Sequence, residues 1–466
     1  MKKIALIYPP IDDDYCLVGV NDCPPLGLAV IHNYVMRKAL VQTDIDIFDG
    51  EHTTVGDLEN IIVQEKYDVV GVQPMMASYN MTLRLLKAAK ESGATTVLGS
   101  HHATHLYRNI LRNRHHLVDC IVLGDGEEAF CQIVNGMAFS LIPNLAYWDE
   151  GEIKTTPQQN VAINESYIDC YTKQMLSQYN KRAEAYEHGS ETTFRAFSHK
   201  GCKNRLNSQY CYFCGRADKG FRFKDPEIYL RELDYFVNSC QARHVFEAGD
   251  DFLQDEDWLR ELIRIKEKKY PNLHTKLRIF ARSNRIVESV IPLLHELHID
   301  GVIIGFESGS DRILSIIHKH ATTSDNLQAA NLLFSNGIDT LVHYVVGLPG
   351  EDKQSLDETY QQAQYVQELS FKYMGRKPEG ITGNLIEINP GATAFKQLVK
   401  AFPQKYADED ILSVKETQND YFKMIFGLNT DREVMELRKF FAGYAKKINA
   451  LGRYTYPAGW LQEDFS

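Results

Sequence analysis

The 466-residue sequence lacks long apolar runs and long basic runs. Its first apolar stretch, residues 4–8, is too short for a signal peptide and predicts a first strand. No run of roughly 18 apolar residues appears, so no transmembrane helix is predicted. The 51 basic side chains are outnumbered by 62 acidic ones, giving a net charge of −11. This balance disfavours a nucleic-acid partner, which needs a surface that follows phosphates.

Cysteine is scarce, and its placement indicates the redox compartment. Nine cysteines are present, an odd number, and they are scattered apart from one group between residues 202 and 214. That pattern favours a reducing, cytoplasmic setting over a disulfide scaffold. Cys16 and Cys23 lie in an acidic loop and are too few to hold a second cluster.

The grouped cysteines are Cys202, Cys211 and Cys214, with Phe213 before the last. Three thiolates on one loop can hold three irons of a [4Fe–4S] cluster and leave the fourth iron open. From the residues alone, two alternatives stay open: a disulfide, or a zinc knuckle in which His199 is the fourth ligand.

The chain divides by pattern into four parts. Residues 1–150 alternate short apolar strands with helices, which predicts an α/β, doubly wound, Rossmann-like domain. Such sheets bind ligands outside the carboxyl ends of their strands. Residues 151–192 form a linker with a charged helix near 175–188. The pattern of residues 193–395 predicts a second series of alternating strands and helices. Residues 396–466 are expected to form a helical region rich in aromatic side chains.

Six strand–helix units in residues 193–395 predict a partial (βα)6 barrel. Its strands are expected at residues 194–198, 244–246, 277–281, 301–305, 340–346 and 384–388. The cysteine loop follows the first of these strands, at the carboxyl end where barrel active sites lie.

Polar or glycine-rich turns follow the later strands, one for each unit. The second strand leads into Glu247-Ala248-Gly249-Asp250-Asp251, and glycine there lets backbone carbonyls approach an ammonium group. The third ends at Arg282, whose guanidinium suits a carboxylate. The remaining turns are Gly305-Phe306-Glu307-Ser308-Gly309, Val346-Gly347-Leu348-Pro349-Gly350-Glu351 and Asn389-Pro390-Gly391-Ala392.

These turns, together with Cys211-Tyr212-Phe213-Cys214, resemble the radical S-adenosylmethionine (SAM) superfamily. The family's spacing is C-x3-C-x2-C, and this sequence has C-x8-C-x2-C. The first domain is similar to the cobalamin-binding domain of the class B methylase-like subgroup. The matching segments are Pro24-Pro25-Leu26-Gly27-Leu28, Val70-Gly71-Val72, Leu98-Gly99-Ser100-His101-His102 and Gly124-Asp125-Gly126-Glu127.

The resemblance implies three cofactors and assigns no catalytic side chain. It places a [4Fe–4S] cluster on Cys202, Cys211 and Cys214. It places cobalamin beside Gly99, Ser100, Gly124 and Asp125, with no histidine below the cobalt, because the D-x-H-x-x-G motif is absent. It implies that SAM contacts Phe213, Glu247, Gly249, Asp250, Arg282, Glu307, Ser308, Val346, Gly347 and Leu348.

The implied reaction is methylation of an unactivated carbon, or of phosphorus, in a small-molecule or peptide substrate. A 5′-deoxyadenosyl radical from SAM abstracts hydrogen, and an external flavodoxin- or ferredoxin-type donor supplies the electron. The rival enzymatic readings are cobalamin-dependent ring contraction or cyclisation, and cobalamin-free mutase or lyase chemistry. The non-enzymatic rival is an iron–sulfur or zinc-binding protein.

Overall fold

The structure is a computed structural model. It describes residues 1–11, 15–17, 25–160, 163–164, 193–218, 220–242, 244–453 and 458–461. The expected helix near 175–188 and the side chains of Cys16 and Cys23 lie outside the described residues.

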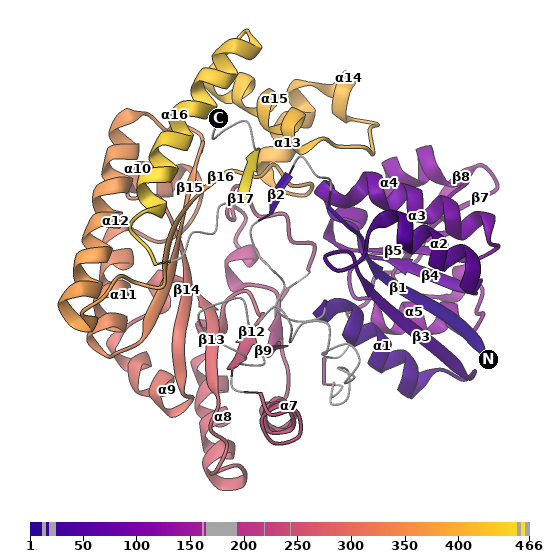
Figure 1. Ribbon diagram of the computed structural model, residues 1–466, viewed down its shortest axis with the longest axis horizontal. Helices are drawn as coiled ribbons and strands as arrows, with labels where there is room; N and C mark the ends of the chain where they lie inside the picture. Colours follow the sequence, from indigo (N-terminus) through magenta and orange to yellow (C-terminus); the bar gives the residue numbers. More distant parts are fainter. Residues whose placement is uncertain are drawn as a thin grey trace.

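The first domain is a doubly wound sheet, as predicted (Figure 1). Its strand order is β3-β1-β4-β5-β6-β7-β8, parallel from β3 to β6 and antiparallel thereafter. Ile4 and Leu6 of β1 pack with α1 and α5, whereas Ala5 and Ile7 pack with α2, α3 and α4 on the other face. The elements are β1 (Lys2–Tyr8), α1 (Leu26–Lys38), β3 (Thr43–Asp49), α2 (Val55–Glu65), β4 (Val69–Val72), α3 (Tyr79–Glu91), β5 (Thr95–Gly99), α4 (His101–Arg114), β6 (Cys120–Val122), α5 (Glu127–Val134), β7 (Leu145–Asp149) and β8 (Glu152–Thr155).

The hairpin of β7 and β8 was not predicted, and it carries the first sheet past the expected domain end at residue 150. Its turn is Glu150-Gly151, and both residues have positive φ, 46° and 88°. Glycine suits that backbone, and a two-residue turn of this kind matches the twist of the paired strands. The strands are short, and no residue of β8 is buried, so they carry little hydrophobic pattern in the sequence.

The second domain is an open parallel sheet of order β16-β15-β14-β13-β12-β9, which confirms the predicted partial barrel. On β14, Val302, Ile304 and Phe306 are buried against the outer helices, and the alternate residues face inward. The elements are β9 (Thr193–Ala196), α7 (Pro226–Asn238), β12 (His244–Glu247), α8 (Glu256–Lys269), β13 (Lys276–Ala281), α9 (Ile291–Glu296), β14 (Ile299–Glu307), α10 (Asp311–Ile316), α11 (Thr323–Ser335), β15 (Asp339–Val346), α12 (Lys353–Met374) and β16 (Gly380–Leu385).

The sixth barrel strand lies earlier than predicted. It is Gly380–Leu385 rather than residues 384–388. Two glycines weaken the strand signal of the true segment, whereas the apolar residues after Leu385 look more strand-like. Gly383 is required there, since a Cβ would lie 2.9 Å from the Cα of Ala445 on the covering helix α16.

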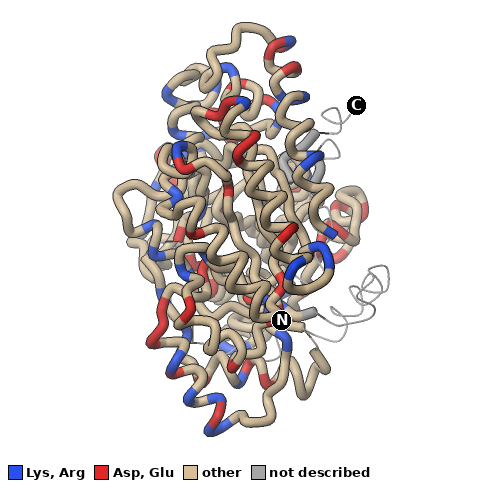
Figure 2. The backbone as a smooth tube through the Cα atoms, turned by 90° about the vertical axis from the view of Figure 1, so that its left-hand side faces the viewer, with Lys and Arg blue, Asp and Glu red and all other residues tan. Residues whose placement is uncertain are grey.

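The C-terminal helices cover the β16 side of the barrel, and a short antiparallel pair joins the two ends of the chain (Figure 1). These helices are α13 (Thr393–Ala401), α14 (Pro403–Tyr406), α15 (Val414–Phe426) and α16 (Asp431–Asn449). The pair consists of β2 (Tyr15–Leu17) and β17 (Ala458–Leu461). Acidic and basic residues are interspersed along the chain in Figure 2. Over the described ranges, no helix has the length and apolar character needed to span a membrane.

Residues 407–410 fasten the C-terminal region to helix α4 of the first domain. Asp410 is fully buried there and accepts hydrogen bonds from Arg114 Nε (2.9 Å), Asn113 Nδ2 (2.9 Å) and the Tyr79 hydroxyl (3.1 Å). Asn109 adds two bonds to backbone carbonyls of the same segment. The two domains are therefore tied together by the C-terminal region as well as by direct contact.

Replacing Asp410 with alanine should loosen this attachment. The change leaves the partly buried Arg114 cation and two further donors without their acceptor, which we expect to cost about 3 kcal/mol. The measurement is the midpoint of thermal unfolding, together with protease cleavage near residue 410. Asp408→Ala removes an exposed pair with Arg112 and is the matched control, which should leave the midpoint unchanged. Equal midpoints for both variants would contradict the expected role of Asp410.

Candidate active site

A cavity of about 460 Å³ lies between the two domains. It is bounded by the carboxyl ends of β1, β4, β5 and β6 on one side and of β9 and β12 on the other. Of the predicted site residues, the structure brings six into its wall: Gly99, Ser100, Gly124 and Asp125 from the first domain, and Gly249 and Asp250 from the barrel. Residues of the first domain and of the β12 loop thus line one cavity.

Two of the lining glycines are required by geometry. Gly124 has φ +89°, a backbone conformation that other residues rarely adopt. Gly249 passes directly over the His199 ring, where a Cβ would approach ring atoms to 2.2 Å. The backbone therefore forms the wall at both places.

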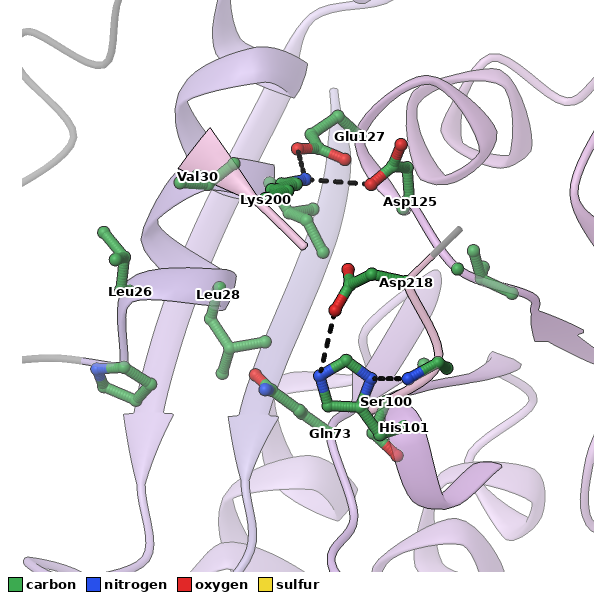
Figure 3. A pocket seen from close by; sticks show the side chains of 18 of the residues that line it. Leu26, Leu28, Val30, Gln73, Ser100, His101, Asp125, Glu127, Lys200 and Asp218 are labelled. Atoms are coloured by element: carbon green, nitrogen blue, oxygen red, sulfur yellow. Dashed lines mark hydrogen bonds and ion pairs between the residues drawn. The ribbon is translucent and has the colours of Figure 1, made fainter. Parts of the chain in front are cut away.

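A buried charge cluster holds the domains together at the wall of this cavity (Figure 3). Lys200 donates to Asp125 (3.0 Å) and to Glu127 (2.8 Å), and Arg222 reaches the other oxygen of Asp125 (2.7 Å). Burial works to lower the pKa of Lys200, but Glu127 and Asp125 outweigh it and raise that pKa. Lys200 is therefore charged, and its ion pairs with Asp125 and Glu127 offset the free-energy cost of removing this charge from water.

Asp125→Ala should destabilise the protein through this cluster. It leaves two cations of the barrel facing a single carboxylate, and we expect a loss of about 3 kcal/mol of folding free energy. The measurement is the thermal unfolding midpoint at low and high salt. Glu152→Ala, which removes the exposed pair with Lys154, serves as the control with little effect. A midpoint for Asp125→Ala that matches this control would rule out the cluster as the main domain contact.

The cysteine loop is closed at its base by a small antiparallel ladder. The strands are β10 (His199–Lys200) and β11 (Arg222–Phe223), and the loop between them carries all three cysteines. The long first gap forms a 3-10 turn, Lys203–Leu206, in which Asn204 is buried and Leu206 is 61% exposed. Residues 206–209 are exposed, whereas Asn204 lies beside the cysteines.

Side-chain hydrogen-bond donors lie beside two of the three thiols, those of Cys211 and Cys214. Asn204 Nδ2 lies 3.2 Å from Cys211 Sγ, and Arg205 and Arg282 each place a guanidinium nitrogen 3.7 Å from Cys214 and Cys211. All three cysteines are free and partly buried. Such donors stabilise anionic sulfur, so the donor set fits an iron–sulfur cluster. Burial, reinforced by Asp251, raises the pKa of Cys202 to about 11, so cluster binding must displace its proton.

His199 does not have the environment of a zinc ligand. Its ring is buried, and its two nitrogens lie 2.9 Å from the Ser198 hydroxyl and 3.1 Å from the Asp251 amide. Burial lowers the pKa of this histidine to about 3. Within the part of the chain that the structure describes, no three His, Cys, Asp or Glu side chains converge on one metal-ion position. Because both ring nitrogens of His199 are engaged by Ser198 and Asp251, a zinc knuckle with His199 as the fourth ligand is disfavoured.

The β12 loop separates a supporting carboxylate from an unpartnered one. Glu247 is fully buried and accepts hydrogen bonds from Ser198, Tyr229 and Gly249, so it braces the loop and does not line the cavity. The predicted contact between Glu247 and SAM therefore stays a prediction, and the structure shows its carboxylate engaged by internal donors. Asp251 is buried, and both of its carboxylate oxygens lack a hydrogen-bond partner. Burial raises its pKa to about 6.

The β14 turn brings Glu307 into a buried ion pair. Glu307 has φ +65°, rare for a residue with a side chain, and follows an irregularity in the pairing with β15. Its carboxylate accepts from Lys319 Nζ at 2.8 Å, and Gly305 leaves room for both groups. Arg282 donates to the Lys319 carbonyl, so this loop also touches the cysteine region.

Other predicted SAM contacts lie in the core. Ser308 is fully buried and binds the Ser310 amide, so its side chain supports the turn. The side chains of Val346 and Leu348 are fully buried, and the amides of Gly347 and Leu348 both donate to Glu351. The carbonyls of Val346 and Leu348 accept from the Ile386 and Glu351 amides at 3.0 and 3.2 Å, so most polar groups of this turn are engaged internally. Phe213 is partly buried and packs against the same core.

Several residues of this region were not predicted. Lys200 lies in the two-residue strand β10 and Lys319 in a loop, neither has a periodic pattern around it, and only the fold gives them acidic partners. Arg216 and Asp218 line the cavity, and their position shortly after the last cysteine was the one sequence feature that could have indicated a place in the site. Arg216 forms an ion pair with Asp250 at 2.6 Å, which joins the cysteine loop to the β12 loop.

Comparison with protein families gives two matches. Residues 198–363 match the radical SAM superfamily, and residues 14–134 match the B12 binding domain. The chain therefore contains a radical SAM domain preceded by a B12-binding domain.

Among curated proteins, the chain is 25% identical to an uncharacterized methyltransferase of Pyrococcus horikoshii, over 77% of each chain. It is 24% identical to the anaerobic magnesium-protoporphyrin IX monomethyl ester cyclase of Rubrivivax gelatinosus, over 78% of this chain and 65% of that one. The chain thus spans just under two thirds of the cyclase.

Two solved structures share the whole arrangement. The radical SAM methyltransferase TsrM from Kitasatospora setae, with cobalamin and a [4Fe–4S] cluster bound, aligns at TM-score 0.63 and 14% identity, over 86% of this chain and 79% of that one. The cobalamin-dependent radical SAM enzyme OxsB, with aqua-cobalamin and SAM bound, aligns at 0.66 and 15% identity, over 96% and 70%. At these identities the likeness concerns the fold.

Proposed function

We propose that this protein is a cobalamin-dependent radical SAM enzyme that methylates an unactivated carbon, or phosphorus, of a small-molecule or peptide substrate. The observation that carries the proposal is the single cavity at the carboxyl ends of both sheets, with the β12 loop in its wall and the three-cysteine loop beside it. Two cofactors that share one substrate need such a chamber.

The residues present fit the three cofactors. Cys202, Cys211 and Cys214 would hold the cluster, and the wall formed by Gly99, Ser100, Gly124 and Asp125 would accept cobalamin. When bound, the cofactors supply reductive cleavage of SAM to a 5′-deoxyadenosyl radical and delivery of a methyl group.

The chain's own groups bind and orient. Gly249, Asp250, Glu307 and the turn of residues 346–348 would hold SAM, with Glu247 and Ser308 bracing their loops. The Asp251 carboxylate, buried beside Cys202, raises the pKa of that thiol and is itself stabilised as an anion by Arg282. The protein in this proposal works in the cytoplasm and takes its electron from a flavodoxin- or ferredoxin-type donor.

A second candidate is an oxidative cyclisation by the same cofactors. The similarity to the anaerobic cyclase of Rubrivivax gelatinosus favours it. Both reactions begin with SAM cleavage, and they differ in whether the product gains a methyl group.

Deuterated SAM separates the two candidates. Reconstituted enzyme is incubated anaerobically with CD3-labelled SAM, a reductant and a pool of small metabolites and peptides. Methylation predicts a product that carries the CD3 label, found by mass spectrometry. Products that lose hydrogen without gaining the label would contradict methylation and support cyclisation.

The iron content and the cobalamin binding of the protein provide the first test of the proposal. Anaerobically reconstituted protein should contain about four irons and bind hydroxocobalamin at micromolar concentrations. The triple alanine variant of the cluster cysteines should lose the iron and keep cobalamin, because the cavity wall contains none of the three. Cys240→Ala, outside the cluster loop, is the matched control. Full iron in the triple variant would contradict the cluster assignment.

Glu307 provides a test of the SAM site. Glu307→Ala removes the partner of Lys319 and should weaken SAM binding and 5′-deoxyadenosine formation by roughly tenfold or more. Lys319→Met tests the other half of the pair and should have a similar effect. Asp325→Ala, at an exposed helix cap, is the control. Normal SAM affinity in both pair variants would show that SAM binds elsewhere.

A further inference from the structure

Helix α4 of the first domain places two histidines against the barrel. His101 and His105 are four residues apart in the first turns of α4, so they share one face of the helix. His102, between them, points the other way and lies 5.0 Å from the Tyr79 ring. In the sequence, His101 and His102 belong to a segment that is similar to the cobalamin-binding domain, and no contact was predicted for either histidine.

Both histidines contact the segment that follows the last cluster cysteine. His101 Nδ1 accepts from the Ala217 amide at 3.0 Å, and its Nε2 lies 3.1 Å from Arg216 Nη1 and 4.0 Å from Asp218 (Figure 3). His105 Nε2 lies 3.0 Å from the Gly215 carbonyl. The segment Gly215–Asp218, directly after Cys214, is therefore held on the first domain at both of its ends.

The fit around His105 leaves no spare room. A Cβ on Gly391 would lie 2.2 Å from the His105 ring, and a Cβ on Gly215 would lie 2.9 Å from the Pro390 carbonyl. Two barrel turns thus close on the imidazole where glycine is needed for the approach. The His105 ring is therefore packed between the cysteine loop and the turn that follows β16.

The same segment reaches the cavity. Arg216 forms an ion pair with Asp250, and His101, Arg216, Ala217 and Asp218 all line the cavity wall. Any displacement of α4 against the barrel would therefore move the cysteine loop relative to the cavity.

We infer that His101 and His105 are positioning residues that fix the distance between the cluster loop and the cofactor cavity of the first domain. The inference rests on the proposed function for what the cavity and loop hold. The docking itself stands on the contacts above, and its geometry requires no change in protonation of either ring.

The first measurement needs no cobalamin. Hydrogen exchange of residues 215–218 is followed in iron-loaded wild type, His101→Ala and His105→Ala. Loss of docking predicts exchange at least about tenfold faster in both variants. His116→Ala, an exposed histidine just beyond the same helix, should leave it unchanged. Wild-type exchange in both docking variants would overturn the inference.

The second measurement reads the separation directly. The magnetic interaction between bound cob(II)alamin and the reduced cluster is recorded by EPR in the same proteins. We expect one defined interaction in the wild type and a weaker, heterogeneous one in the alanine variants, with iron content and cobalamin binding retained. His101→Asn and His105→Gln, which can keep the hydrogen bonds to Ala217 and Gly215, should restore it.

An unchanged interaction in the alanine variants would overturn the inference, as would a failure of both conservative variants to restore it. Absence of cobalamin binding in the wild type would instead overturn the proposed function, and the exchange data would still decide the docking.

Discussion

The arrangement depends on the carboxyl ends of two parallel sheets facing each other across one cavity. Each sheet alone offers a row of turns with exposed backbone groups, the usual place for ligands in this kind of fold. Lys200 and Arg222 of the barrel meet Asp125 and Glu127 of the first domain at the cavity wall. These charges are largely removed from water, so they are stable only while the two domains stay docked and each charge keeps its partner.

Three further contacts act on the same interface. The C-terminal segment around Asp410 holds α4 from one side, and the cysteine loop holds the same helix through His101 and His105. Arg216 then carries the connection to the β12 loop through Asp250. The cysteine loop, the β12 loop and the cavity wall thus share supports, which is what chemistry between two cofactors requires of a protein.

The sequence was sufficient to predict the two sheets, because buried parallel strands produce short apolar runs and their turns contain glycine and acidic residues at regular places. The cysteine group and the cavity glycines were predictable for the same local reason. The β7–β8 hairpin and the start of β16 were missed, since polar or glycine-containing strands carry little pattern.

The roles of individual carboxylates were harder to predict. Glu247 and Asp251 lie in one motif, and only the fold determines that the first is saturated by internal donors and the second is not. The acidic partners of Lys319 and Lys200 come from other segments of the chain, so these ion pairs could be identified only in the folded structure. Interactions between residues far apart in sequence leave no periodic signal, so charge pairs of this kind require the structure.

Filling the cavity tests the central claim most directly. Gly99 lines the cavity, and a Cβ there would meet only Val122, at 3.7 Å, so the backbone tolerates a side chain at this position. The measurement is hydroxocobalamin binding to anaerobically reconstituted Gly99→Trp, alongside its iron content. Our account predicts that the variant retains about four irons and no longer binds cobalamin. Wild-type cobalamin affinity in this variant would contradict the assignment of the cavity.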